Sequence, residues 1–220
     1  MTYSLIGLCP RTGQIGAAVA TSSIAVGSRV PFCEAGVGAV LTQHRTDPRL
    51  GPRGLALLRS GCTAAETVAA LVASTPARDA AWRQLAVLDA AGGTAHHHGA
   101  QVKPERDAAH GPGVVALGNI LSSARVPAAM RDAFLDDPSQ PLAERLLRGL
   151  ETGEAAGGEH GAVTSAGLLV VWREAFPYVD LRVDKAAEPL AALRALWAEY
   201  APLADGFLRR ALAPEDAPVI

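Results

Sequence analysis

Short apolar segments separated by turn residues open the chain. Residues 3–9 form one such segment, and residues 14–21 form a second in which Ile, Ala and Val alternate with small residues. The Pro-Arg-Thr-Gly sequence between them is a turn signal, so the pattern predicts a β-hairpin. Counting back from this turn places Thr2 beside Thr21 and Ser22.

The rest of the chain alternates between groups of strands and pairs of helices. Periodicity predicts strands at 30–33, 36–42, 83–89, 94–98, 113–121, 165–172 and 179–183. It predicts helices that start near residues 55, 63, 127, 141 and 189, and a loop over the polar residues 101–111. This order lacks the strict βαβ alternation of a parallel sheet and suits antiparallel sheets covered by segregated helices. We therefore expect an α+β fold, for which two sheets with helices outside both is one solution.

The 220 residues are enough for one domain with a sizeable core. No internal repeat or linker interrupts the pattern, so we expect a single domain over residues 1–212. Residues 213–220 contain prolines and are expected to form a loose tail.

Composition narrows the classes of function. The chain has 49% hydrophobic and 19% charged residues, as globular proteins do. Its formal net charge of −2 offers no basic face for DNA or RNA, and no apolar run reaches the roughly 18 residues of a membrane-spanning helix. The start of the chain lacks the pattern of a signal peptide, and Cys9, Cys33 and Cys62 show no CxxC spacing. We expect a soluble cytoplasmic protein with reduced cysteines and with no nucleic-acid or membrane partner.

Thr2 is the first candidate for chemistry. Once Met1 is removed, Thr2 carries a hydroxyl and a free α-amine on one residue. A threonine hydroxyl alone is a weak nucleophile, and the N-terminal amine is a recognised base for it. An unperturbed α-amine titrates at about pH 7.7–8.0, close to the working pH that a general base needs. Many proteins begin with Met-Thr without using the threonine, so this role depends on the surroundings of Thr2.

Three further side chains are expected near Thr2. Ser22 and Ser23 follow the hairpin and are candidates to orient the amine or to relay a proton; the alternative is ordinary turn chemistry at the end of a strand. Asn119 ends a predicted strand and is a candidate donor to an oxyanion or a substrate carbonyl. Its alternative role is a turn residue with left-handed backbone.

The stretch Thr42-Gln43-His44-Arg45 follows an apolar strand. Backbone amides in such a loop can form an oxyanion hole, and the Gln43 amide can bind substrate. The alternative is a polar loop that opens the next helix.

The run His96-His97-His98 is the only histidine cluster in the sequence. On a strand, His96 and His98 point to one face and could hold Zn²⁺ with a third ligand, which makes a metal-dependent hydrolase a third interpretation. No HExxH, paired CxxC, phosphate loop, GxSxG elbow or dinucleotide fingerprint supports a metal or a cofactor, so we expect neither.

Many blocks of the sequence, in order, resemble a bacterial family catalogued as domain of unknown function 1028. They are residues 2–6, 16–22, 25–27, 35–43, 51–55, 83–85, 118–121, 156–158, 165–171 and 178–184. The resemblance runs from Thr2 to about Tyr200 and so covers nearly the whole chain.

This resemblance implies an Ntn-hydrolase-like four-layer αββα sandwich, with two antiparallel sheets between helix layers and Thr2 as the terminal nucleophile. It supplies no substrate. The sequence departs from the family pattern at His98, where members usually read Thr, and around Glu159 and His160, in a segment that tends to read Gly-Gly-Asp-Arg-Arg-Gly-Gln-Ser. If these residues contact the substrate, this member binds a different ligand or has lost activity.

Two functions follow as hypotheses. The first is an amidohydrolase that acts on a small amide or other C–N bond substrate. The second is a non-catalytic protein that binds a small molecule on the same fold. A homodimer is a plausible assembly for either.

Overall fold

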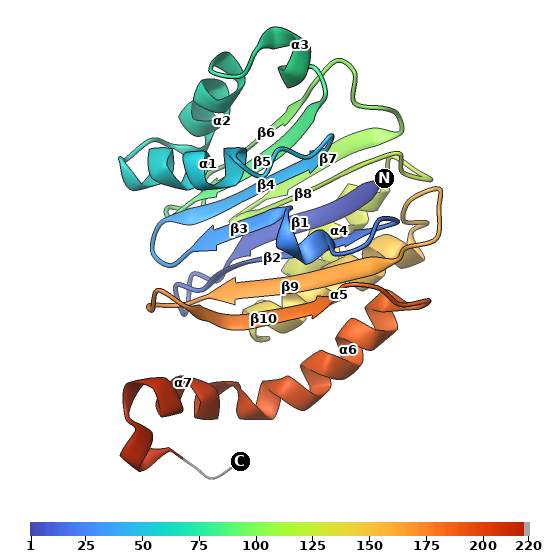
Figure 1. Cartoon of the computed structure of the whole chain (residues 1–220). Coiled ribbons are helices and arrows are strands. Elements are labelled where there is room, and N and C mark those ends of the chain that lie inside the picture. The colour runs from blue at the N-terminus through green and yellow to red at the C-terminus, as the bar shows by residue number, and fades with distance from the viewer. Residues whose placement is uncertain (218–220) are drawn as a thin grey trace.

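The computed structural model describes residues 1–217 and contains two antiparallel β-sheets. The larger sheet has the strand order β10-β9-β2-β1-β8-β7, and the smaller has the order β3-β4-β5-β6 (Figure 1). The strands of the larger sheet are β1 (Thr2–Leu8), β2 (Ile15–Thr21), β7 (Arg106–Gly111), β8 (Val114–Asn119), β9 (Ser165–Val171) and β10 (Pro177–Val183). Those of the smaller sheet are β3 (Pro31–Glu34), β4 (Gly38–His44), β5 (Arg83–Asp89) and β6 (Thr94–His98).

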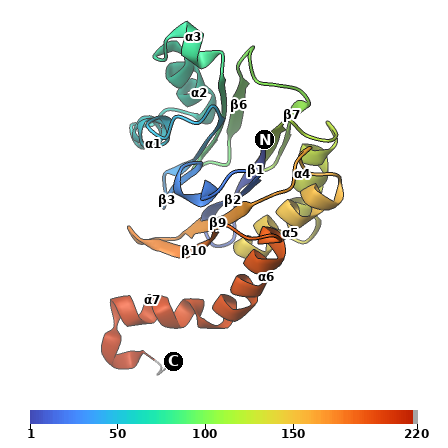
Figure 2. The same ribbon diagram turned by 45° about the vertical axis from the view of Figure 1, so that its right-hand side comes forward.

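Helices cover the outer face of each sheet. The helices are α1 (Leu50–Arg59), α2 (Ala64–Ala73), α3 (Ala77–Ala80), α4 (Val126–Asp136), α5 (Leu142–Ala155), α6 (Pro189–Tyr200) and α7 (Ala204–Leu212). Helices α1 and α2 pack on the smaller sheet, and α4 and α5 pack on the larger one (Figure 2). The two sheets face each other between these helices, so the layers run helix, sheet, sheet, helix. Helix α6 lies against β9 and β10, and α7 projects beyond them (Figure 1).

Apolar side chains line both faces of the larger sheet, because successive residues of a strand point to opposite sides. Toward the smaller sheet, Ile6 and Leu117 belong to the same buried cluster as Leu41. Toward α4 and α5, Leu5 belongs to a cluster that includes Phe134. Burial on both faces explains why β1 reads as a continuous apolar run and not as an alternating one.

Strand pairing places Thr2 at one end of the sandwich. Tyr3 pairs with Ala20 in the β1–β2 hairpin, which confirms the predicted hairpin and its register. On its other side Thr2 pairs with Asn119 at the end of β8. The first residue of β1 therefore lies between the last residues of β2 and β8.

Two sequence-based expectations about elements are wrong. Residues 106–111, expected to lie in a loop, form β7 at the edge of the larger sheet. An edge strand exposes one side to solvent, so its polar composition resembles that of a loop. Helix α1 begins at Leu50, before residue 55, because Gly51 and Gly54 pack closely on Phe32 and Val40 and tertiary contact overrides low helix propensity.

The C-terminal part is more regular than expected. Pro214–Asp216 forms a 3-10 turn inside the expected loose tail at 213–220, and residues 218–220 lie outside the described residues. Within residues 1–217, none of the helices combines the length and the apolar character needed to cross a bilayer.

Candidate functional site

Thr2 has a buried side chain, 6% exposed, at the start of β1. Its Oγ1 lies 3.1 Å from Oγ1 of Thr21 at the end of β2. Both hydroxyls donate to the carbonyl oxygen of Met1. Two hydroxyl groups from neighbouring strands therefore converge on one carbonyl group that is attached to the Thr2 nitrogen.

A cavity of about 400 Å³ opens beside these hydroxyls. Thr2, Thr21 and His44 line it together with Arg45 and Arg83. This volume falls in the range of small-molecule sites. Thr2 is thus both shielded by the sheets and adjacent to a space that a small ligand can fill.

Glu159 lies in the loop after α5 with 6% of its surface exposed, and neither carboxylate oxygen has a hydrogen-bond partner among residues 1–217. Burial raises the pKa of Glu159 to about 7, and the nearby N-terminal ammonium group opposes this shift. Burial also lowers the pKa of that terminal amine, while Glu159 raises it. The buried carboxyl group of Glu159 and the α-amine of Met1 therefore lie close together, and each affects the pKa of the other.

A buried polar network lies behind Thr2, between the sheets. Oε1 of Gln84 accepts from Nε2 of Gln43 and from Nδ2 of Asn119, each at 2.7 Å. Nε2 of Gln84 donates to the Gly118 carbonyl at 2.7 Å, and Oε1 of Gln43 accepts from the Ser4 hydroxyl at 2.7 Å. Each amide is oriented by its neighbours, because turning one would place two acceptors or two donors together.

This network leaves one atom of Asn119 free. Its Nδ2 is bound to Gln84, and its Oδ1 has no partner among the described residues although it is buried. The free atom of Asn119 is therefore an acceptor, opposite Thr2 in the strand pairing.

Ser22 and Ser23 follow β2 in different environments. Ser22 is half-buried and lies beside Glu159, whose pKa it lowers against the larger effect of burial. Ser23 is exposed, and its hydroxyl accepts from a guanidinium nitrogen of Arg29 at 2.6 Å. Of the two serines, only Ser23 lines the cavity.

The three residues at the end of β4 diverge. Thr42 donates to the carbonyl oxygen of Asp47 at 3.2 Å, and Gln43 points into the buried network. His44 lines the cavity, and its Nδ1 lies 3.0 Å from the carbonyl oxygen of Trp82. Burial lowers the pKa of His44, which favours the neutral form of its imidazole.

His98 and His160 lie apart from the cavity wall. His98 on β6 reaches the buried network from the far side, where its Nε2 lies 3.3 Å from Nε2 of Gln84, and burial lowers its pKa to about 4. The side chain of His160 is exposed, and its backbone N–H donates to the Ile120 carbonyl. The roles predicted for these two residues in substrate binding stay predictions.

The histidines of β6 pair with each other and with β7. The rings of His96 and His98 lie on one face, 4.8 Å apart, as the strand pattern predicts. Nδ1 of His96 lies 2.7 Å from Nε2 of His110. Within residues 1–217, no group of three His, Cys, Asp or Glu side chains is arranged to hold a metal ion. The metal-dependent interpretation therefore has no ligand set in the described part of the chain.

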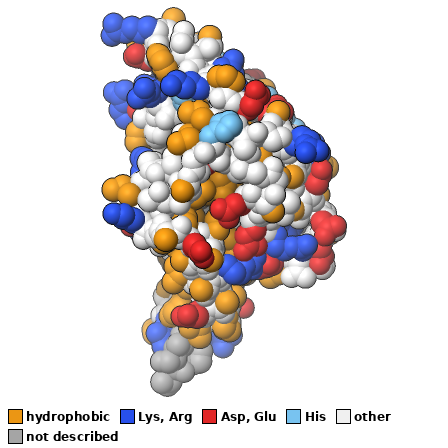
Figure 3. Space-filling model, turned by 90° about the vertical axis from the view of Figure 1, so that its right-hand side faces the viewer, with side chains coloured by type: hydrophobic (Ala, Val, Ile, Leu, Met, Phe, Trp, Pro, Cys, Tyr) orange, Lys and Arg blue, Asp and Glu red, His pale blue; other side chains and the backbone are white. Residues whose placement is uncertain are grey.

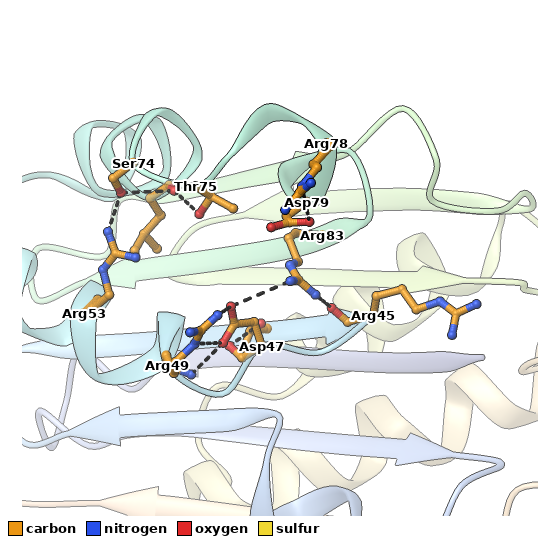
Figure 4. A network of polar contacts seen from close by, with 11 residues as sticks. Arg45, Asp47, Arg49, Arg53, Ser74, Thr75, Arg78, Asp79 and Arg83 are labelled. Atoms are coloured by element: carbon orange, nitrogen blue, oxygen red, sulfur yellow. Dashed lines mark hydrogen bonds and ion pairs between the residues drawn. The ribbon is translucent and has the colours of Figure 1, made fainter.

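Sequence reasoning missed Gln84, Arg29 and Arg83, whereas Arg45 belongs to the candidate stretch at the end of β4. Gln84 stands in a strand of apolar residues directly opposite Gln43, and two glutamines paired across buried strands are the signal that could have identified the network. Figure 4 shows the arginines at the rim: Arg83 reaches Asp47 and the carbonyl oxygen of Arg45, while the Arg45 guanidinium points away from Asp47.

Residues 2–193 match the family model described as a family of unknown function, DUF1028. The chain belongs to the DUF1028 family. The match covers the whole sandwich and ends within α6, so the resemblance seen in the sequence blocks is confirmed.

A crystal structure of another DUF1028 protein, SPO2555 from Silicibacter pomeroyi, is similar to this chain at 30% identity with a TM-score of 0.84. The similarity covers 91% of this chain and 86% of that one. Anbu, the ancestral beta-subunit from Yersinia bercovieri, aligns over 90% of this chain and 94% of its own, at 11% identity and a TM-score of 0.40, which is too low to carry an argument. A search of curated proteins finds no match to the chain.

Proposed function

We propose that this DUF1028 chain, once cleaved between Met1 and Thr2, is an N-terminal-nucleophile hydrolase that acts on a small amide or related C–N bond. The observation that carries the proposal is the convergence of the Thr2 and Thr21 hydroxyls on the Met1 carbonyl, beside a cavity of small-molecule size. The layered fold and Thr2 as its first strand residue are consistent with the Ntn-hydrolase-like architecture expected from the sequence. A shared fold does not specify a substrate, so the residues around Thr2 carry the proposal.

The Met1 carbonyl indicates where a substrate carbonyl would lie. Thr21 donates to it, so after cleavage we expect the same hydroxyl to donate to a substrate oxygen. A donor positioned where negative charge develops stabilises the transition state of acyl transfer. Thr21 thus takes the oxyanion role that sequence reasoning gave to the amides near Gln43.

The reaction then proceeds in two balanced steps. Thr2 Oγ1 attacks the acyl carbon while its proton passes to its own α-amine, and the substrate C–N bond breaks as the leaving amine takes that proton. Water then hydrolyses the ester on Thr2, with the α-amine again accepting a proton, and releases the acid. The ester on Thr2 Oγ1 is thus formed in the first step and hydrolysed in the second, which regenerates the free Thr2.

Glu159 and Asn119 suit the ammonium form of this base. Glu159 lies near the α-amine of Met1, one residue before the Thr2 nitrogen, and Asn119 presents a free acceptor oxygen opposite Thr2. Acceptors hold an ammonium group and cannot hold an oxyanion, so we assign Asn119 to the amine and not to the oxyanion that sequence reasoning chose. Ser22 lies beside Glu159, and the role proposed for it is to orient the amine or to relay a proton.

Kinetics of processed protein test this proposal. Protein whose intact mass shows loss of Met1 is assayed on a panel of small primary amides and ureido compounds. Thr2→Ser is expected to keep turnover, whereas Thr2→Ala is expected to lose about 10⁴-fold or more in kcat. Ser60→Ala, which changes an exposed hydroxyl after α1, is the matched control and is expected to match the parent.

Full activity of Thr2→Ala would remove Thr2 from the mechanism. Binding of panel compounds without turnover, by processed protein with an intact fold, would favour the non-catalytic binding protein instead.

A further inference from the structure

The charged side chains that line the Thr2 cavity are all basic. They are Arg29, Arg45 and Arg83, and His44 completes the ionisable set. Among residues 1–217, no Asp or Glu contributes to the cavity wall. In Figure 3, Lys and Arg side chains also gather on the upper part of the molecule, over α1–α3. A small cavity with walls of one charge sign concentrates ligands of the opposite sign.

Two of the three arginines have no carboxylate partner among residues 1–217. Arg29 donates to the carbonyl oxygens of Ile24 and Ala25 at 2.6 and 2.7 Å and to the Ser23 hydroxyl, all of them neutral acceptors. Arg45 is exposed and lies over the ring of Trp82, 5.5 Å from its centroid. Neutral acceptors and an aromatic face orient a guanidinium group without cancelling its charge.

The third arginine shares its carboxylate. Arg83 lies 3.7 Å from Oδ2 of Asp47, while Arg49 holds both oxygens of the same Asp47 at 2.8 Å (Figure 4). Nε of Arg83 is buried and has no hydrogen-bond partner among the described residues. One carboxylate therefore faces two guanidinium groups, and the cavity keeps an excess of positive charge.

Glu159 does not offset this excess. It lies near the terminal amine and does not line the cavity. Burial raises its pKa to about 7, so a substantial fraction of it is uncharged at neutral pH. The charge at the cavity wall is therefore positive, although the net charge of the whole chain is −2.

We propose that the ligand of this cavity is a small amide that carries a carboxylate group, which Arg45 and Arg83 bind while the amide carbonyl lies against Thr2 and Thr21. This inference rests on the proposed function for the position of the amide. Guanidinium groups bind carboxylates through paired hydrogen bonds, and both Arg45 and Arg83 line the cavity.

Matched acids and neutral amides test the inference. The probes are malonamate, succinamate and glutaramate, each compared with propionamide, butyramide or valeramide of the same carbon count. Binding to processed Thr2→Ala protein is measured by calorimetry, which requires no turnover. At least one acid is expected to bind roughly tenfold more tightly than its neutral partner, as a hydrogen-bonded charge pair provides.

Variants locate the source of the preference. Arg45→Gln is expected to remove most of the preference for the acid over its neutral partner. Arg45→Lys is expected to keep part of that preference. Arg53→Gln removes the same charge from an exposed arginine that binds Ser74 outside the cavity, and is expected to keep all of it. In the active protein, Arg45→Gln should raise KM for the acid more than KM for its neutral partner, whereas Arg53→Gln should leave the ratio of these two KM values unchanged.

The two proposals fail separately. Charge preference without hydrolysis of any probe would keep the carboxylate site and refute the hydrolase. The carboxylate site would be overturned if no acid bound more tightly than its neutral partner. It would also be overturned if Arg45→Gln and Arg53→Gln lost this preference equally. Both results hold whether or not amides are hydrolysed.

Discussion

Replacing Gln84 by Leu tests how much the buried network between the sheets contributes to stability. Leu removes both polar atoms of Gln84 while keeping a similar volume, so the change leaves little cavity. It deletes three hydrogen bonds of 2.7 Å, from Gln43, from Asn119 and to the Gly118 carbonyl. All of these groups are buried away from water.

The magnitude follows from the groups left without partners. Each unpartnered buried donor or acceptor costs about 1–3 kcal/mol. Rearrangement of the remaining polar side chains recovers part of this loss. The gain in apolar burial from Leu offsets another part. We therefore expect Gln84→Leu to lower the free energy of unfolding by about 3 kcal/mol.

Urea unfolding followed by tryptophan fluorescence measures this change as a shift of the midpoint at constant slope. Gln101→Leu is the control, because Gln101 is exposed and only its backbone N–H bonds to Ala81; it is expected to change stability by at most about 0.5 kcal/mol. A loss below about 1 kcal/mol in Gln84→Leu, with the slope unchanged, would refute the argument that the network is fully desolvated.

Three further changes probe other parts of the fold and site. Burial holds the pKa of Glu159 near 7, above its ordinary value near 4.5, so the native state binds the proton more tightly and stability falls as pH rises through this window. Glu159→Gln should flatten that slope and stabilise the protein above pH 7 by about 1–2 kcal/mol, after allowing for screening by solvent. Gly7→Ala would place a methyl group 2.5 Å from the Phe134 ring and should lower the free energy of unfolding by about 1–3 kcal/mol. Arg194→Met removes ion pairs to Glu151 and Glu144 and should cost about 1 kcal/mol at low salt and less at high salt.

Thermal and urea unfolding check all three. An unchanged pH slope in Glu159→Gln would show that Glu159 is solvated. If Gly7→Ala left the free energy of unfolding unchanged, α4 would be shown to move readily on the sheet. A salt-independent effect of Arg194→Met would assign its contribution to packing.

The sequence predicts the β1–β2 hairpin well because its turn and its side-chain pattern agree. The Pro-Arg-Thr-Gly turn fixes the register, and this places Thr2 beside Thr21 as the structure has it. Strand β7 could not be predicted in the same way, because an edge strand with a polar face lacks the apolar pattern on which such predictions depend.

The composition of the site was harder to predict than its location. Thr2 and Asn119 were expected near each other and are paired across strands. Gln84 and Arg83 come from β5, and their approach to Thr2 depends on how the two sheets pack face to face. The orientation of Asn119 depends on its bond to Gln84 and cannot be read from local sequence. Hairpin geometry is local, whereas contacts between sheets require the whole fold.

The most direct test of the central claim compares two forms of the same protein. Expression with and without active methionine aminopeptidase gives chains that keep Met1 or start at Thr2, and intact mass identifies each form. We expect the form that starts at Thr2 to hydrolyse a small amide and to show an acyl ester on Thr2 after acid quench, and the form that keeps Met1 to do neither. Equal hydrolysis by both forms would contradict the claim that the free amine and hydroxyl of Thr2 perform the reaction.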